Sequence, residues 1–300
     1  MDSEQRISQD QRLVVAKVFP GGQIDSTSAQ PLSDWERGKR DIGLLQHGYG
    51  PELLDIITNE LGLVTINKEG ILQSKIIVLP SEDGVRGAVM RLLGKIAEAL
   101  VVRSCNSDPM MNRKWGQVGR RGRNLHTAPD DYLAIGTGLE STKRDYPQKF
   151  RPNDPHRDVI WLEKKSLLSE MPMLENGKPI GISAGLQLKA SMDGFRYIYR
   201  SDVARAKYEV PLVYFDLCND YYRLTDAIYK EEQDVVIGRD LVRGKDIDPS
   251  CHDELYSYWW LVEQLVCGKM SADELSRTPI LYDAYSKQVL EERGSSIISI

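Results

Sequence analysis

Residues 182–191, Ile-Ser-Ala-Gly-Leu-Gln-Leu-Lys-Ala-Ser, alternate strictly between apolar and polar or small side chains. Side chains on a β-strand point to opposite faces in turn, so this pattern predicts a strand with one apolar face and one polar face. Gln187 and Lys189 then lie together on the polar face. Gly185 lies on the same face, and a glycine inside a strand often marks a place where a ligand or another part of the chain approaches closely.

A second apolar segment, 159–162, directly follows Asp158 and predicts a neighbouring strand. If the two strands pair, the Asp158 carboxylate, the Gln187 carbonyl oxygen and the Lys189 ammonium meet at one place. Carboxylate and amide oxygens are hard ligands that suit Mg²⁺. An ammonium group can hold or deprotonate a water molecule and offset negative charge that builds on phosphorus. Together these residues predict metal-dependent cleavage of a phosphodiester.

Residues 85–103 carry apolar side chains at helical spacing, which predicts a long helix before the strands. Beside the apolar row runs a second row, composed of Gly87, Arg91, Gly94 and Glu98. Each glycine costs a helix about 1 kcal/mol relative to alanine. Two such glycines are reasonable where this edge of the helix must approach the sheet closely. The row then predicts that Glu98 points at the strands.

Asp158 and the triplet Gln187-Leu188-Lys189 resemble the PD-(D/E)xK nuclease superfamily, which has the restriction-endonuclease-like fold. The glutamine variant resembles the pattern of Mrr-type nucleases, and the resemblance covers about residues 85–220. It implies an α/β protein with a mixed central sheet flanked by helices and an α-β-β-β-α-β core. Because glutamine carries no charge, one carboxylate of the usual pair is missing. The resemblance implies Mg²⁺, with Mn²⁺ as the alternative ion, held by Asp158, Gln187 and Glu98, with Lys189 organising the water.

The other predicted elements divide the chain into three regions. An N-terminal accessory region is expected over residues 1–80, a nuclease-like catalytic core over 81–230, and a mainly helical C-terminal region packed on the core over 231–300. Within the core we expect strands at 132–138 and 210–217, a tight turn at Asn176-Gly177 and a crossover helix at 201–209. Within the accessory region we expect a linker at 20–34, a helix at 51–61 that begins at Pro51, and a strand at 73–79.

A cluster of positive charge precedes the core strands, although the net charge of the chain is −5. The cluster consists of Arg113, Lys114, Arg120, Arg121 and Arg123. It lies in a segment with three glycines, Gly116, Gly119 and Gly122, which we interpret as rich in turns. Arginine binds phosphate and guanine edges bidentately, so the segment is a candidate contact for double-stranded DNA. The alternative is a flexible basic loop without a ligand. A second basic group, diluted by acids, leads up to Asp158 and comprises Lys143, Arg144, Lys149, Arg151 and Arg157.

The bulk composition excludes some classes of protein. The four cysteines form no C-x-x-C pair and lie outside any zinc-site spacing with histidine. No segment approaches the ~20 apolar residues of a membrane span, and the N-terminal residues lack the apolar run of a secretory signal. We therefore expect a reduced cytoplasmic protein without structural zinc and without a membrane partner.

Three hypotheses on function remain open from the sequence. The first is a Mg²⁺-dependent DNA endonuclease of the restriction or anti-phage defence type, working as a homodimer because each chain carries one centre. The second is a non-catalytic DNA-binding or scaffold protein on a degenerate nuclease fold, which the glutamine in place of an acid favours. The third is an unrelated α/β protein in which Asp158 and Lys189 lie far apart.

Overall fold

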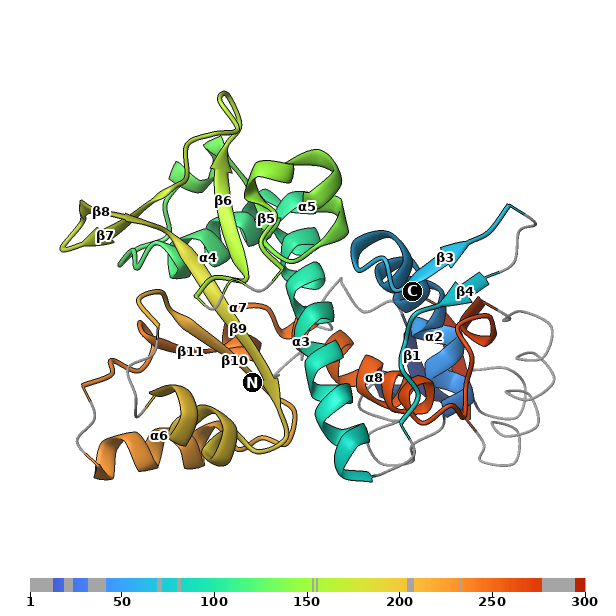
Figure 1. The fold of residues 1–300 in the computed structure, drawn as a ribbon. Coiled ribbons are helices and arrows are strands. Elements are labelled where there is room, and N and C mark those ends of the chain that lie inside the picture. Colours follow the sequence, from blue (N-terminus) through green and yellow to red (C-terminus); the bar gives the residue numbers. More distant parts are fainter. Residues whose placement is uncertain are drawn as a thin grey trace. The chain divides into compact units, whose positions relative to one another are not determined.

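Figure 1 shows the chain as a computed structural model with two compact units. It describes residues 13–18, 24–31, 42–68, 72–79, 82–152, 154, 156–203, 208–231, 234–276 and 295–299. One unit joins residues 1–55, 64–85 and 256–300, and the other joins 56–63 and 86–255. Both units are assembled from segments that are distant in the chain, and the three consecutive regions expected from the sequence stay a prediction.

The larger unit, 56–63 with 86–255, is built on a five-stranded mixed sheet in the order β11-β10-β9-β6-β5. Its strands are β5 (Tyr132–Gly136), β6 (Val159–Glu163), β9 (Gly185–Ser191), β10 (Leu212–Asp216) and β11 (Leu241–Arg243). β5, β6 and β9 pair antiparallel, whereas β9, β10 and β11 run parallel. This confirms the mixed central sheet and the approximate positions of the expected strands.

One face of this sheet is covered by two helices, η4 (Phe195–Val203) and α6 (Tyr221–Lys230). Both helices contribute to one buried apolar cluster with Leu212 and Tyr214 of β10. In the parallel register of β9 and β10, Leu212 pairs with Gln187 and Tyr214 with Lys189. Register partners on neighbouring strands point to the same side, so Gln187 and Lys189 point to the face that η4 and α6 cover.

The opposite face is covered by α4 (Pro109–Gly119), which follows the long helix α3 (Glu82–Ser107). The Trp115 ring of α4 lies 6.3 Å from the Phe215 ring. A Cβ atom on Gly119 would stand 2.7 Å from the ring of Trp161, so only glycine allows α4 to pack this closely on β6. Phe215 and Trp161 alternate with Tyr214 and Ile160, which places them on the other side of the sheet from Gln187.

The segments between the core strands differ in detail from the expectation. Residues 182–183 belong to β8 (Lys178–Ser183), which forms a hairpin with β7 (Pro172–Glu175) and extends away from the sheet in Figure 1. The turn Asn176-Gly177 joins these strands as predicted, with left-handed φ values of 51° and 78°. The crossover helix begins at Phe195 and not at residue 201, and residues 204–207 of the expected helix lie outside the described ranges.

Shorter elements connect the core strands and follow them. They are η2 (Ala128–Asp131), α5 (Glu140–Asp145), η3 (Pro147–Lys149), α7 (Gly244–Ile247) and α8 (Pro249–Val266). In the described ranges, no helix is both long enough and apolar enough to cross a membrane.

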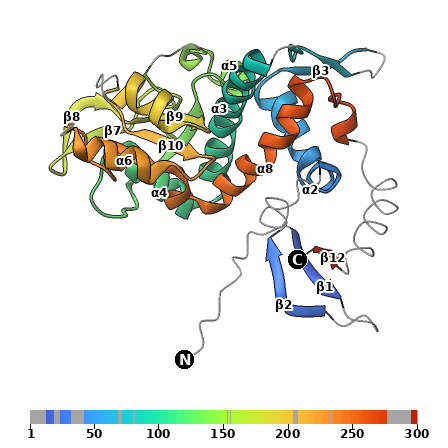
Figure 2. The ribbon, with the colours of Figure 1, turned by 90° about the horizontal axis from the view of Figure 1, so that it is seen from below.

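The smaller unit contains a three-stranded antiparallel sheet in the order β12-β1-β2. Figure 2 shows β12 (Ser295–Ser299) beside β1 (Leu13–Val18), with β2 (Ile24–Pro31) on the other side. The linker expected at 20–34 is therefore wrong for residues 24–31.

The remaining elements of the N-terminal region also depart from the expectation. Pro51 lies inside α2 (Ile42–Asp55) and does not begin a helix, and α2 continues into η1 (Ile56–Glu60). The strand expected at 73–79 is only β4 (Leu72–Ser74), which pairs with β3 (Val64–Ile66). Near the other end of the chain, η5 (Glu274–Ser276) begins with reciprocal hydrogen bonds between Ser271 and Glu274, as their capping-box spacing predicts.

Candidate active site

The pairing of β6 with β9 brings Asp158 and Gln187 together. Val159 pairs with Leu186, so Asp158 stands opposite Gln187. The Gln187 Nε2 donates a hydrogen bond of 2.5 Å to Asp158 Oδ2, and the backbone N–H of Leu188 donates one of 2.7 Å to the same oxygen. The Gln187 side chain is buried, yet its Oε1 accepts no hydrogen bond within the described part of the chain. A buried carbonyl oxygen without a partner is uncommon, and this one is available to a ligand.

Glu98 of α3 reaches the same region from the helix. Its side chain is 1% exposed, and its Oε1 accepts a hydrogen bond of 2.7 Å from the backbone N–H of Gly138, just after β5. The glutamate thus points at the sheet, but the reason inferred for the helix glycines is wrong. A Cβ on Gly94 would meet nothing within 4 Å, and one on Gly87 would meet only the Arg91 guanidinium of the same helix.

The two carboxyl groups influence each other electrostatically. Burial raises the pKa of Glu98 to about 7, the Asp158 charge adds to this rise, and Lys95 opposes it. Burial also raises the pKa of Asp158, against the opposing effects of the Leu188 N–H and of the ammonium groups of Lys95 and Lys189. Two acids held in a site that disfavours their charge are an arrangement that a bound cation stabilises.

Lys189 lies beside these groups on β9. Its ammonium lowers the pKa of Asp158 and stands 5.6 Å from the centroid of the Tyr208 ring. The predicted site residues Asp158, Gln187 and Lys189 therefore lie on one face of the sheet, and Glu98 reaches the end of β5 from the α4 side, since a Cβ on Gly136 would stand 2.7 Å from its Oε1. We call these four residues the polar cluster.

Sequence reasoning missed Lys95 as a member of the site. Its Nζ lies 3.3 Å from Glu98 Oε2 and 3.5 Å from the Pro152 carbonyl oxygen. The three-residue step from Lys95 to Glu98 places both on one side of α3, a signal that the sequence contained. Its proximity to Asp158 depends on the fold and could not be read from the spacing.

A cavity of about 750 Å³ opens next to the polar cluster. It is lined by Arg151, Pro152, Asp154, His156, Arg157, Gly181, Ile182, Ser183, Glu209 and Val210. Arg157 directly precedes Asp158, and its side chain lies where a Cβ on Gly185 would stand, at 2.8 Å from Cδ. The strand glycine therefore allows the close approach of another part of the chain, as its position predicted. Two residues of the second basic group, Arg151 and Arg157, thus line a space beside the candidate site.

The segment from Arg113 to Arg123 differs from the turn-rich loop that we expected. Residues 109–119 form α4, which covers the face of the sheet opposite Gln187. Arg113 pairs with Asp130 at 2.6 Å, Arg121 pairs with Asp240 at 3.1 Å, and Arg123 donates to Asn176 at 2.9 Å.

The two remaining cations of this segment, Arg120 and Lys114, differ in their exposure. Burial lowers the pKa of Arg120, which is half-buried. Lys114 is exposed and has no ion-pair partner in the described ranges. The role of the segment in DNA binding stays a prediction, with two of its charges already paired with carboxylates.

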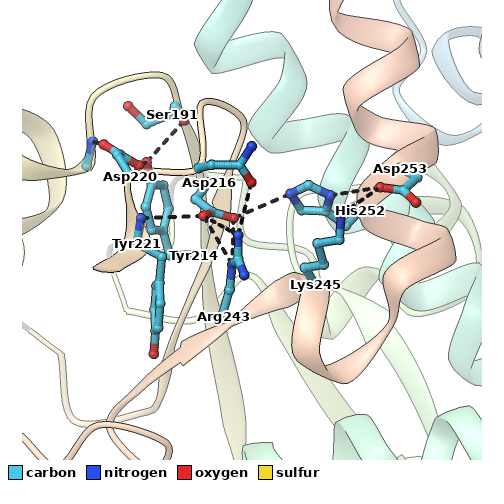
Figure 3. A network of polar contacts seen from close by, with 11 residues as sticks. Ser191, Tyr214, Asp216, Asp220, Tyr221, Arg243, Lys245, His252 and Asp253 are labelled. Atoms are coloured by element: carbon cyan, nitrogen blue, oxygen red, sulfur yellow. Dashed lines mark hydrogen bonds and ion pairs between the residues drawn. The ribbon is translucent and has the colours of Figure 1, made fainter. Parts of the chain in front are cut away.

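A second polar network lies at the carboxyl end of β10 (Figure 3). Asp216 is fully buried, with Arg243 Nη2 at 2.8 Å and His252 Nε2 at an ion-pair distance of 3.4 Å. Burial acts to raise the pKa of Asp216, but Arg243 and His252 outweigh it and hold this pKa below its ordinary value. Because protein cations already neutralise this carboxylate, the network is a structural tie between β10, β11 and α8.

The donor set of the polar cluster fits a hard divalent cation. Its two carboxylates and one partnerless amide oxygen are all oxygen ligands, the kind that Mg²⁺ binds. The cluster contains two carboxylates only, and no group of three His, Cys, Asp or Glu side chains that could hold a metal occurs among the described residues.

The fold and the site define a mixed α/β protein with an acid–amide–lysine cluster on its central sheet. Comparison with family models, with curated proteins and with solved structures gives no match to this chain.

Proposed function

We propose that this chain is a Mg²⁺-dependent DNA endonuclease of the restriction or anti-phage defence type, with the restriction-endonuclease-like fold. The observation that carries the proposal is the proximity of the Glu98 and Asp158 carboxylates, with the partnerless Gln187 Oε1 and the Lys189 ammonium beside Asp158. The order α3, β5, β6, β9, η4 and β10 supports it, because it follows the α-β-β-β-α-β order of that fold once α4, η2, α5, η3 and the hairpin β7-β8 are counted as insertions.

Each residue of the polar cluster has a role in this proposal. Glu98, Asp158 and Gln187 would hold the ion, which when bound polarises a phosphoryl oxygen and makes a water molecule more acidic. Lys189 would orient the attacking water and offset the charge that develops on phosphorus. The Gly138 N–H and Lys95 hold the Glu98 carboxylate in place.

The proposal extends to the working form of the protein. We propose a homodimer that acts on double-stranded DNA in the cytoplasm, since cutting both strands with one centre per chain usually needs two chains. Sedimentation of the protein with a DNA duplex would report the stoichiometry, and a single chain that cuts both strands would contradict the dimer.

The direct test is Lys189→Ala. We expect it to reduce Mg²⁺-dependent conversion of supercoiled plasmid to nicked and linear forms by at least about 100-fold, the usual effect of losing a general acid–base group. Circular dichroism and the melting temperature should stay unchanged because Lys189 is only half-buried. Lys178→Ala is the matched control, as Lys178 is exposed at the start of β8. Full activity of Lys189→Ala would refute the assignment.

A second candidate function is a non-catalytic DNA-binding or scaffold protein. It is favoured by the hydrogen bonds from Gln187 and Leu188 to Asp158, which satisfy that carboxylate without a metal. Isothermal titration calorimetry with Mg²⁺ and with Mn²⁺ separates the two candidates. Heat of binding that disappears in Asp158→Asn supports the nuclease, whereas DNA binding by a folded protein that takes up neither ion supports the scaffold.

A further inference from the structure

Two helices on the Gln187 and Lys189 side of the sheet carry arginines that stack on aromatic rings. η4 and α6 pack against each other over this face, and in Figure 1 they lie side by side. The guanidinium carbon of Arg200, from η4, lies 5.3 Å from the centroid of the Phe195 ring. The guanidinium carbon of Arg223, from α6, lies 5.1 Å from the same centroid.

These two arginines have no carboxylate partner among the described residues, in contrast to Arg113 and Arg121 of the α4 segment. The nearby acids are engaged with other groups. Asp226 pairs with Lys230 at 2.7 Å, and Asp220 accepts from the Tyr214 hydroxyl at 2.6 Å.

The remaining acids of this surface are engaged as well. Asp193 accepts the backbone N–H of Arg196, and Asp202 accepts the Tyr208 hydroxyl at 3.2 Å. Arg200 and Arg223 are therefore exposed and form no ion pair with these acids among the described residues.

Exposed aromatic and basic side chains extend the same surface. Tyr197 is 50% exposed and Tyr222 is 71% exposed. Arg196 is exposed, with its guanidinium 5.8 Å from the centroid of the Tyr197 ring. In sites for single-stranded nucleic acid, positive charge follows the backbone and aromatic rings stack on the bases. On a duplex only the first of these contacts is open, so the arginines are the residues that would bind it.

The charge arrangement itself indicates an anionic ligand. Two guanidinium groups that share one phenyl ring gain from cation–π attraction but repel each other. An anion that contacts both groups removes this repulsion. The planar guanidinium fork matches the geometry of phosphate oxygens, so each of these arginines can bind a phosphate bidentately.

We propose that this arginine–aromatic surface, composed of Phe195, Arg196, Tyr197, Arg200, Tyr222 and Arg223, binds the phosphodiester backbone of a DNA duplex. The inference deepens the proposed function, on which it rests for the identity of the polyanion. η4 and α6 cover the face to which Gln187 and Lys189 point, so a duplex held there is on the side of these two residues. The arginines that follow α4 belong to the other side of the sheet.

The test compares two double variants that each remove two positive charges. One is Arg200→Ala with Arg223→Ala, and the matched control is Lys165→Ala with Lys178→Ala, two exposed lysines outside both basic groups. Binding of a labelled random-sequence duplex is measured by fluorescence anisotropy in EDTA over a range of salt concentrations. Since each phosphate contact contributes about 0.9 to the slope of log affinity against log salt, we expect the first variant to reduce that slope by about 2. We also expect it to weaken binding at least about tenfold near 0.1 M salt, while the control stays close to wild type.

Several outcomes would overturn the proposal. One is an equal loss of DNA affinity in both double variants, which would be an effect of net charge. Another is a larger loss of affinity in the control, and a third is unchanged affinity in the first variant. Wild-type protein that binds phosphatidylserine vesicles but no duplex would also overturn it. If the first variant unfolds, Arg200→Gln with Arg223→Gln replaces it and carries the same expectations. A duplex bound with the expected arginine dependence but left uncut in Mg²⁺ would support the surface and refute the nuclease.

Discussion

At the scale of single residues, Glu98 is the group whose chemistry is most changed by the fold. Its carboxyl group is 1% exposed, with Lys95 and the Gly138 N–H as partners and Asp158 nearby. Burial raises its pKa from 4.5 to about 7. Its charged form at neutral pH therefore costs stability, since burial disfavours the carboxylate.

Glu98→Gln tests this cost. A carboxyl group with a raised folded pKa contributes stability below its unfolded pKa, and this contribution is lost as the pH rises through the folded value. We therefore expect Glu98→Gln to be more stable than wild type at pH 8. Since one pKa unit corresponds to about 1.36 kcal/mol, the difference in the free energy of unfolding should be on the order of 1–3 kcal/mol. The difference should be close to zero near pH 4.5. Urea unfolding at the two pH values measures it, and an equal difference at both would contradict the assigned pKa.

At the scale of elements, the two helices around the sheet use glycine in opposite ways. Gly94 lies in the middle of α3, where a Cβ would meet no atom within 4 Å. Gly119 lies at the end of α4, where a Cβ would stand 2.7 Å from Trp161. The fold therefore requires glycine at the second position and merely tolerates it at the first.

This contrast predicts opposite effects of the same substitution. Gly94→Ala should stabilise the protein by up to about 1 kcal/mol, because alanine is the better helix former and meets open space. Gly119→Ala should destabilise it, because Trp161 or α4 must shift. Chemical denaturation of both variants checks this, and a destabilised Gly94→Ala variant would show that α3 contacts something at this position.

Regular patterns along the sequence predicted the main helices and strands. The features that these patterns did not predict depend on packing between segments that are distant in the chain. Strict alternation placed Gln187 and Lys189 on one face correctly, and helical spacing led from Val85 to Glu98. Glycines in the arginine-rich segment indicated turns, but Gly119 lies at the end of α4, where the missing side chain allows close contact with Trp161. The sequence also did not predict that Arg200 and Arg223 lie near the same Phe195 ring, because the two arginines come from helices that precede and follow β10 in the chain.

At the scale of the whole molecule, the ion that we propose for the polar cluster would couple binding to stability. A ligand that binds only the folded state raises stability in proportion to the logarithm of its concentration over its dissociation constant. Since the unbound Glu98 and Asp158 carboxylates disfavour the fold most at high pH, we expect Mg²⁺ to raise the melting temperature at pH 8 and to have little effect at pH 5. Thermal scans with and without Mg²⁺ check this, with Asp158→Asn as a control that should not respond. An equal rise in that variant would place the ion elsewhere.

The antiparallel pairing of β1 with β12 joins residues 13–17 to residues 295–299 in a single sheet. During translation the first of these strands leaves the ribosome long before its neighbour is made, so this sheet can be completed only after residues 295–299 are made. The unit that carries the polar cluster draws on no residue beyond 255. All residues of the unit proposed to cut DNA are therefore translated before β12 is made.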